Sequence, residues 1–445
     1  MRRLALRLAL LLFLALRLSA APEAMLVVVG DQHSAYDRTA QFVARVDRLR
    51  AENPGVPLAV LIDGDSLEYG NVVAQRTSGR IDFALFRALA QRVPTVLNLG
   101  NHEPEFYDLP ETVKRLQAAG LSVISGNLRD RATGRPYAPA SMTLQLGAHQ
   151  LVLVGVATDR LATYRLAIRP QLDLADPVVW AKRNFSPLLA QAPLPVVLSH
   201  AGLRADREML PLVPDGTLFA GAHDHLRFVH PVGRTVYFHS GSWLEFVSIA
   251  RLEQTPEGLR WRVEPERLAA QPVDAPLAKM IRETLAQQLT SAETAIVGHS
   301  ARALGPGEAA TFAVEAARAA AGADAALIGA TTFGAGLPAG DVSRFAFDAC
   351  VRFDGPLFVA EVDGAWLQQL MARANQGPAT PFAERSGENL VAVAPAVIVA
   401  GRRYRFVTTD WIAKNARTYL GENPPALTAH PELKLKAAVL AALRR

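Results

Sequence analysis

Five short pieces of the sequence carry side chains that are suited to metal chemistry. In chain order they are Asp31-x-His33, Gly64-Asp65, Gly100-Asn101-His102-Glu103, Ser199-His200 and Gly221-Ala222-His223-Asp224-His225. Carboxylate oxygens, an amide oxygen and imidazole nitrogens together suit Mn, Fe, Co or Zn. A carboxylate that bridges two such ions makes a two-metal site, which can clamp the attacking and the leaving oxygen of a phosphoryl group. No single piece is specific, but all five in this order indicate a metal site.

Each piece closely follows, or ends, an apolar run that is predicted to be a β-strand. Strands are expected at 25–29, 58–62, 95–99, 151–156, 195–199 and 217–220. Helical patterns lie between strands, for example at 42–49 and 83–89. This alternation predicts a layered α/β domain, in which ligands bind beyond the carboxyl ends of the strands. We therefore expect the five pieces to meet at one edge of the sheet.

The rest of the chain is predicted to contain a connecting helix and a second unit. A hairpin is expected at 251–263 and a linking helix at 276–289. The second unit has predicted helices at 308–321, 366–373 and 433–443, strands at 357–362, 391–399 and 404–408, and a loop at 375–389. The domain bounds that we expect are 25–265 for the first domain, 266–290 for the linker and 291–445 for the second.

Length and composition exclude several classes of protein. The 445 residues, half of them apolar and 20% charged, are ordinary for a globular chain and too apolar for a disordered one. The net charge is +5, but Arg2, Arg3, Arg7 and Arg17 account for four of these charges. The basic balance is therefore poor evidence for nucleic-acid binding. Cys350 is the only cysteine, which excludes an intrachain disulfide and a cysteine-held iron–sulfur cluster.

The N-terminus has the three parts of a secretory signal. A basic start is followed by the apolar run at 8–16 and by small residues at 19–21. Nine apolar residues are too short to span a hydrocarbon core of about 30 Å as a helix. We expect residues 1–24 to be a signal peptide and the mature protein to be periplasmic or secreted, with no stable membrane span after processing. The alternatives are an uncleaved membrane anchor and a buried strand.

The motifs also carry a family resemblance. The segments DQH, DGD, GNHE, LSHAG and GAHDH resemble the motif series of the calcineurin-like metallophosphoesterases. Their order, and a second unit with ADAALI, LPAGDVS and YRFVTTDW, resemble the 5′-nucleotidase/UDP-sugar hydrolase branch of that family. The resemblance implies a four-layer α/β sandwich as the catalytic domain and a smaller α/β substrate domain, joined by the linker helix.

The resemblance implies a role for each predicted site residue. Asp31, His33 and His225 would hold one ion, Asn101, His200 and His223 the other, and Asp65 would bridge the two. His102 would contact the phosphoryl oxygens and protonate the leaving oxygen, while Glu105 replaces the Asp that usually pairs with this His. Family members often have Gln at the position of His225. The implied reaction is in-line attack of a metal-bridging hydroxide on phosphorus.

The second domain differs from the family in the turn that, in family members, holds the phosphate of the substrate. The branch has an Asn-Gly-Gly-Gly-x-Arg turn after its ALI strand, whereas this chain reads Gly329-Ala-Thr-Thr-Phe333-Gly334 and lacks both Asn and Arg. Arg352, Arg402, Arg403 and Arg417 could supply the missing charge. The substrate-binding residues implied by alignment are Trp411, Tyr419 and Phe333, with Trp411 placed to stack on a base or, alternatively, buried in an interdomain core.

We therefore expect a dimetal-dependent phosphohydrolase of the 5′-nucleotidase type. Its cofactors would be two divalent ions of Mn, Zn, Co, Fe or Mg, and its partner a small-molecule phosphate ester, with nucleotides favoured and no nucleic acid. Two alternatives stay open. One is a 2′,3′-cyclic nucleotide phosphodiesterase or a non-nucleotide phosphoesterase. The other is a non-catalytic binding protein that keeps metal for structure. The sequence does not indicate an oligomeric state.

Overall fold

The computed structural model describes residues 21–444. Most of the predicted signal peptide lies outside this range, so its prediction is not tested. Within residues 21–444, no helix is both long enough and apolar enough to cross a membrane.

The N-terminal domain contains two six-stranded sheets. The first has the strand order β14 (Gly258–Arg267), β13 (Phe246–Thr255), β1 (Ala24–Gly30), β2 (Leu58–Asp63), β3 (Thr95–Asn98) and β4 (Ser122–Ile124). The second has the order β11 (Arg227–Val232), β12 (Thr235–Ser240), β10 (Leu218–Gly221), β9 (Leu194–His200), β7 (His149–Ala157) and β6 (Ser141–Leu146). Strands β1 to β4 are parallel, and so are β7, β9, β10 and β12.

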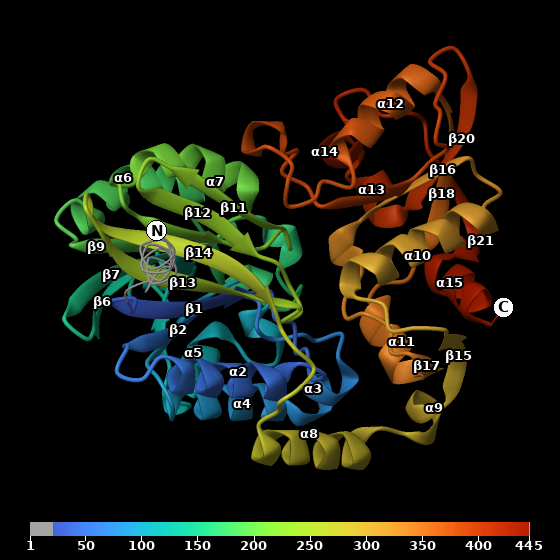
Figure 1. Ribbon diagram of the computed structural model, residues 1–445. Coiled ribbons are helices and arrows are strands. Elements are labelled where there is room, and N and C mark those ends of the chain that lie inside the picture. Colours follow the sequence, from blue (N-terminus) through green and yellow to red (C-terminus); the bar gives the residue numbers. More distant parts are fainter. Residues whose placement is uncertain (1–20, 445) are drawn as a thin grey trace, which may run out of the picture.

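Two layers of helices cover the outer faces of the sheets (Figure 1). Helices α2 (Thr39–Glu52), α4 (Arg80–Ala90) and α5 (Leu109–Ala118) pack on the first sheet, and α6 (Pro177–Leu189) and α7 (Leu203–Met209) on the second. A third apolar cluster, which includes Leu26, Leu61 and Leu198, fills the space between the sheets. The order helix, sheet, sheet, helix confirms the predicted four-layer sandwich.

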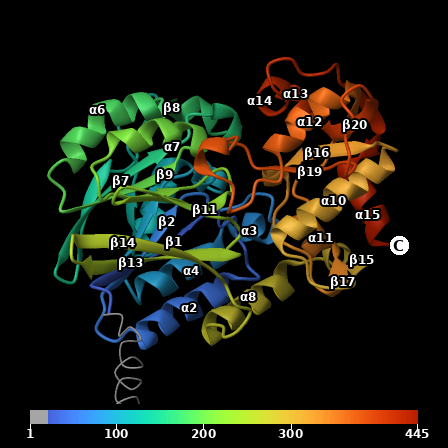
Figure 2. The same ribbon diagram turned by 45° about the horizontal axis from the view of Figure 1, so that its top comes forward.

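Helix α8 (Ala275–Gln288) links the two domains and packs on the first through Leu277 and Ile281. The C-terminal domain has a five-stranded sheet of β19 (Leu390–Val393), β16 (Ala325–Gly329), β20 (Arg403–Thr409), β18 (Pro356–Asp363) and β21 (Thr428–Lys434). Helices α10 (Pro306–Ala320) and α15 (Leu435–Leu443) cover one face and α12 (Gly364–Arg373) the other (Figure 2). The strand expected at 391–399 is wrong beyond Val393, because Pro395 has no N–H to donate to a ladder.

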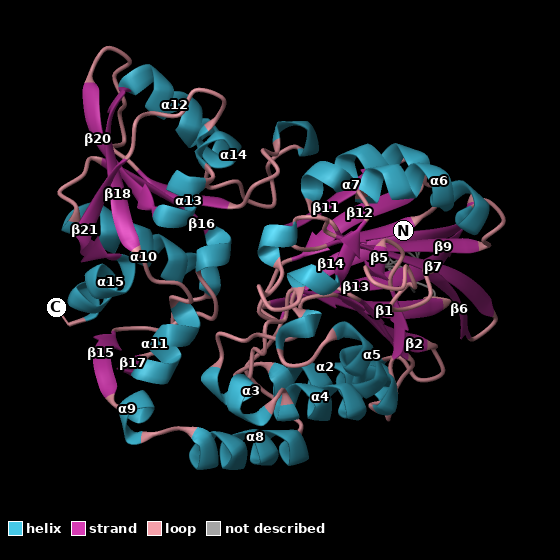
Figure 3. Cartoon of the chain, turned by 180° about the vertical axis from the view of Figure 1, so that it is seen from behind, coloured by secondary structure: helices cyan, strands magenta, loops and turns pink. Residues whose placement is uncertain are grey.

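Residues 375–389, which we call the arm, reach from the C-terminal domain to the N-terminal domain (Figure 3). Phe382 stacks on His230 with 4.2 Å between ring centroids and lies 5.5 Å from the ring of Tyr237. Arg207 on α7 donates hydrogen bonds to the carbonyls of Phe382 and Arg385, at 3.1 and 2.9 Å. The arm thus forms a contact between the domains that is separate from the linker helix.

We expect Phe382→Ala to release the arm. A fully buried aromatic side chain contributes up to about 3 kcal/mol to stability. Because Phe382 is half-buried, its loss should raise the population of molecules with a released arm roughly tenfold. Arg385 is only 4% exposed, and its peptide bond becomes a trypsin site when the arm opens. The measurement is the rate of tryptic cleavage after Arg385. Phe353→Ala, at a phenylalanine that is 56% exposed, is the matched control, and equal rates in all three proteins would contradict the prediction.

Candidate metal centre

The predicted ligands come from the ends of five strands in two sheets. Strands β1, β2 and β3 lead into Asp31, Asp65 and Asn101, respectively, while β9 ends at His200 and β10 leads into His223. We expected a single sheet edge, whereas the structure brings together the corresponding edges of two facing sheets. Two facing edges surround a small volume from both sides, which lets more side chains converge on it.

The first cluster contains Asp31, His33 and His225, whose ligand atoms lie close enough to hold one metal ion. The Nε2 atoms of the two imidazoles are 3.0 Å apart. A carboxylate oxygen of Asp31 lies 4.0 Å from Nε2 of His33 and 3.7 Å from Nε2 of His225. These three residues are the set that the family resemblance implies for the first ion.

The second cluster contains Asp65, His200 and His223 and could likewise hold an ion. A carboxylate oxygen of Asp65 lies 3.1 Å from Nε2 of His200. The same nitrogen is 3.8 Å from Asp31 in the first cluster, so the two clusters adjoin. Asn101 is 2% exposed, and its side-chain oxygen is buried with no hydrogen-bond partner.

The chemistry of these donors fits bound cations. The Oδ1 atom of Asn101 is buried without a hydrogen-bond partner, which is costly unless something else satisfies it. Burial, together with the positive charge of Arg352, lowers the pKa of His33 to about 4. Burial and the charge of His200 lower the pKa of His223 well below normal, and burial with His33 and Arg352 does the same for the pKa of His225. Despite its burial, His200 has a pKa raised well above normal, chiefly by the carboxylates of Asp65 and Asp31. His33, His223 and His225 are therefore neutral, which is the form that binds metal.

The backbone at these positions adopts an uncommon conformation. Five predicted ligands have left-handed φ values: Asp31 at 51°, His33 at 48°, Asp65 at 53°, His223 at 78° and His225 at 56°. Such values are unusual for residues other than glycine and cluster at functional sites. The tight turns that produce them aim several side chains back over the ends of their own strands.

Glu103, which we did not predict as a site residue, holds one of these turns together. It is fully buried, and its carboxylate accepts hydrogen bonds from the backbone N–H groups of Asp65, Ser66 and Gly100 at 3.0, 2.8 and 2.6 Å. These bonds join the turn after β2 to the turn after β3. Glu103 is part of the GNHE motif, which was the available signal for it.

His102 and Glu105 lie beside the two clusters. Nδ1 of His102 is 2.9 Å from a carboxylate oxygen of Glu105, and Nε2 is 3.9 Å from Asp65. Burial lowers the pKa of His102, but the carboxylates of Asp65, Glu105 and Glu68 outweigh it and raise the pKa to about 10. The longer Glu105 thus reaches the imidazole in place of the shorter Asp of the family.

A cavity of about 800 Å³ lies over the clusters and is lined by residues of both domains. Trp411 is 42% exposed, lines this cavity and donates a hydrogen bond from its indole nitrogen to the hydroxyl of Tyr419 at 3.0 Å. Tyr419 lines the cavity as well. The prediction for Phe333 does not agree with the structure, because its apolar ring packs in the core of the C-terminal domain, 3% exposed, and does not line the cavity.

The family's arginine could not be accommodated at Gly334. A Cβ atom built there would lie 2.2 Å from the carbonyl oxygen of Ala349 and 2.8 Å from the indole of Trp243. The turn therefore packs too tightly for any side chain. Other arginines line the cavity instead, namely Arg160, Arg165, Arg169, Arg204 and Arg352.

Four other polar residues of the N-terminal domain, two of them from the motifs, have structural partners. Asp63 accepts a hydrogen bond from Asn98 at 2.9 Å, and its carbonyl oxygen contacts Nδ1 of His200 at 2.7 Å. Asp224 is buried and accepts from the N–H of Leu203. His239 lies in a buried network with Tyr237 and Asp206, and Asn127 bonds both backbone groups of Ala157.

Comparison with known proteins identifies both domains. Residues 25–227 match the model of the calcineurin-like phosphoesterases, and residues 288–408 match that of the 5′-nucleotidase C-terminal domain. A search of curated protein sequences found no match.

Several solved structures resemble the whole chain. A 5′-nucleotidase precursor from Thermus thermophilus has a TM-score of 0.60 at 19% identity, covering 95% of this chain and 96% of its own. The sulfate thiohydrolase SoxB of the same genus has a TM-score of 0.66 at 16% identity, covering 96% of each. A 5′-nucleotidase from Candida albicans has a TM-score of 0.59 at 11% identity, covering 95% of this chain and 98% of its own. The chain thus joins a calcineurin-like phosphoesterase domain at 25–227 to a 5′-nucleotidase C-terminal domain at 288–408, and these two matches support a metal-dependent phosphoesterase.

Proposed function

We propose that the protein is an exported phosphohydrolase of the 5′-nucleotidase type that uses two divalent metal ions. The observation that carries this proposal is the convergence of two adjoining ligand clusters, with His102 beside them, under an open cavity that the second domain helps to line. A purely structural metal site needs neither an open cavity nor a neighbouring imidazole. We place the enzyme in the periplasm or outside the cell, because of the N-terminal pattern at residues 1–24.

In this proposal, Asp31, His33 and His225 would hold one ion, Asn101, His200 and His223 would hold the other, and Asp65 would contribute to both. Mn, Zn, Co, Fe and Mg are all compatible with this donor set. When bound, such ions act as Lewis acids that neutralise charge on a phosphoryl group. His102, kept protonated by Glu105 and Asp65, donates a hydrogen bond to the phosphoryl oxygens and then a proton to the leaving oxygen.

Asp65→Asn and His102→Ala should separate metal binding from chemistry. We expect Asp65→Asn to weaken both metal sites and to abolish most activity, because the amide carries no charge. His102→Ala should keep both ions and lower kcat by about 10²–10³, the usual cost of one positioned polar group. Metal content by mass spectrometry, measured beside kcat for each variant, tests both. A His102→Ala protein that loses its metal would contradict the role assigned to this residue.

Glu105→Gln should change the pH dependence of kcat. The charge of Glu105 helps to raise the pKa of His102 to about 10, so the imidazole stays protonated into the alkaline range. Removing that charge lowers the pKa, and the alkaline fall of kcat should move to lower pH. The measurement is log kcat against pH for the wild type and for Glu105→Gln. Glu111→Gln on α5, at a residue that does not line the cavity, serves as the control. If the alkaline fall of kcat in Glu105→Gln stayed at the wild-type pH, the pairing of Glu105 with His102 would be rejected.

We further propose that the substrate is a small phosphate ester with only a modest preference for nucleotides. A charge-assisted hydrogen bond from a phosphate-binding arginine contributes about 1.5–3 kcal/mol, or roughly 10–100-fold in affinity. Gly334 cannot supply it. Trp411 and Tyr419 can still stack on a base, which is worth about 1–3 kcal/mol in other systems.

The substrate prediction is tested by kcat/KM for 5′-AMP, 2′,3′-cyclic AMP, UDP-glucose and p-nitrophenyl phosphate. We expect kcat/KM for 5′-AMP to exceed kcat/KM for p-nitrophenyl phosphate by less than about a thousandfold. Trp411→Ala should reduce the ratio of these two values roughly tenfold. A thiosulfate ester is assayed as a fifth compound, because SoxB, a sulfate thiohydrolase, has a similar fold. An unchanged Trp411→Ala profile would remove base stacking from the proposal.

A further inference from the structure

Glu68 lies on the side of His33 that faces away from the other predicted ligands. Nε2 of His33 is directed to Asp31 and His225, while Nδ1 is 3.2 Å from a carboxylate oxygen of Glu68. Glu68 is 5% exposed, and its other oxygen accepts a hydrogen bond from the N–H of Gly70 at 2.8 Å. A carboxylate on the second nitrogen fixes both the tautomer and the ring orientation of a metal-binding histidine.

The opposite partner of Glu68 comes from the other domain. Arg352 is 284 residues away in sequence, and its guanidinium forms an ion pair with the carboxylate of Glu68. Its side chain is 5% exposed and also donates to the carbonyl of Thr331 at 3.2 Å. The carboxylate of Glu68 therefore lies between the imidazole of His33 and the guanidinium of Arg352.

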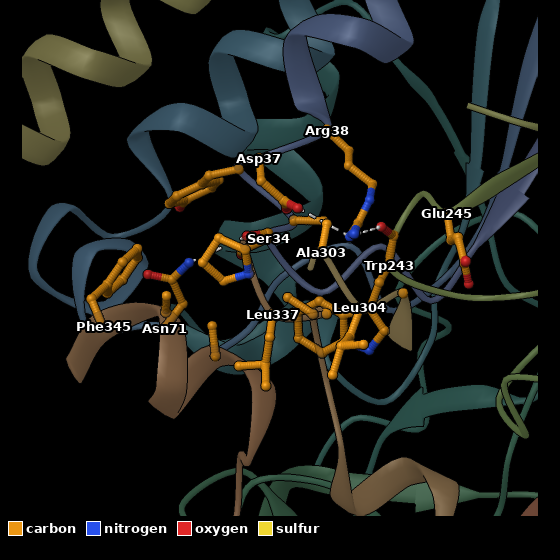
Figure 4. Close-up of a pocket in the computed structure, with 18 of the residues that line it drawn as sticks. Ser34, Asp37, Arg38, Asn71, Trp243, Glu245, Ala303, Leu304, Leu337 and Phe345 are labelled. Atoms are coloured by element: carbon orange, nitrogen blue, oxygen red, sulfur yellow. Dashed lines mark hydrogen bonds and ion pairs between the residues drawn. The ribbon is translucent and has the colours of Figure 1, made fainter. Parts of the chain in front are cut away.

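Trp243 completes the surroundings of His33. Its ring stacks on the imidazole with 5.2 Å between centroids, and the guanidinium of Arg352 lies 5.3 Å from the same ring. On its other side Trp243 lines a second cavity of about 800 Å³ between the domains (Figure 4). Glu68, Trp243 and Arg352 therefore form a wall between that cavity and the predicted metal centre.

The carboxylate of Glu68 lies near two imidazoles, those of His33 and His102. The oxygen that lies 3.2 Å from His33 is also 3.9 Å from Nδ1 of His102, which already has Glu105 at 2.9 Å. A buried carboxylate without its counter-charge is strongly destabilised. Without Arg352, the carboxylate of Glu68 would be stabilised by turning toward His102 or toward a bound cation. The imidazole of His33 would then lose the partner that fixes its orientation.

We propose that Arg352 of the C-terminal domain is a positioning residue for the predicted metal ligand His33, acting through the carboxylate of Glu68. This inference rests on the proposed metal-dependent function. It implies that the cluster of Asp31, His33 and His225 reaches full metal affinity only when the C-terminal domain is docked. Arg352 then serves the metal centre and does not substitute for the family's phosphate-binding arginine.

The test is calorimetric titration of metal-free full-length protein with Mn²⁺. Loss of a partner behind a metal ligand typically weakens binding 10–100-fold. We expect Arg352→Gln and Glu68→Gln each to weaken one of two binding steps by this factor. The double variant should lose no more than either single variant, because both act on one chain of contacts. Arg402→Gln, at an exposed arginine of the same domain that lines neither cavity, is the control.

Three results would overturn the inference. One is wild-type affinity for Mn²⁺ in Arg352→Gln together with a raised KM for the phosphate ester, which would place Arg352 on the substrate. Another is additive losses in the double variant. The third is wild-type affinity for Mn²⁺ in the double variant. This variant removes both buried charges together, so it can still be measured if a single variant fails to fold. If the wild type itself bound no Mn²⁺ and cleaved no ester, the proposed function would fail instead.

Discussion

The need to bury many ionisable groups together, away from water, governs the arrangement of the whole site. A single buried charge costs several kcal/mol unless an opposite charge or several hydrogen bonds compensate it. Asp65 is compensated by His200 at 3.1 Å, and Glu103 by three backbone N–H groups. Each such pairing fixes the position of a turn, so the ends of β2, β3 and β9 are held together by the charges that they carry.

The same constraint connects the two domains. Arg352 brings a positive charge to Glu68, and Asn389 at the end of the arm donates a hydrogen bond to the carbonyl oxygen of His225 at 3.2 Å. Both contacts reach residues that surround one metal-ligand cluster. The C-terminal domain therefore contributes to the electrostatics of the site as well as to the walls of the cavity.

The clustering of the predicted metal ligands could be foreseen from the sequence, because it follows from local patterns. Apolar runs predict strands, parallel strands share their carboxyl edges, and Asp31, Asp65 and His200 each lie at such an end. The layered α/β fold followed from the same alternation. That the edge is shared by two sheets was not apparent, because strand order depends on contacts between distant segments.

Long-range contacts explain what the sequence did not predict. Nothing near Glu68 indicates a partner 284 residues away, and a tryptophan such as Trp243 is an ordinary core residue by sequence. Arg352 was one of four arginines with nothing to direct it. The expected role of Phe333 is wrong because alignment with a turn does not specify which way a side chain points, and this apolar ring, four residues beyond the end of β16, packs inward.

The left-handed backbone at five predicted ligands has a consequence for the evolution of the protein. A residue other than glycine in this conformation costs on the order of 1–3 kcal/mol, so Asp31, His33, Asp65, His223 and His225 together store strain comparable with a large part of a domain's net stability. Glycine at any of them would relax the backbone and remove a ligand. Selection for heat resistance alone would therefore favour inactive sequences, and only continued demand for the reaction keeps these side chains in place.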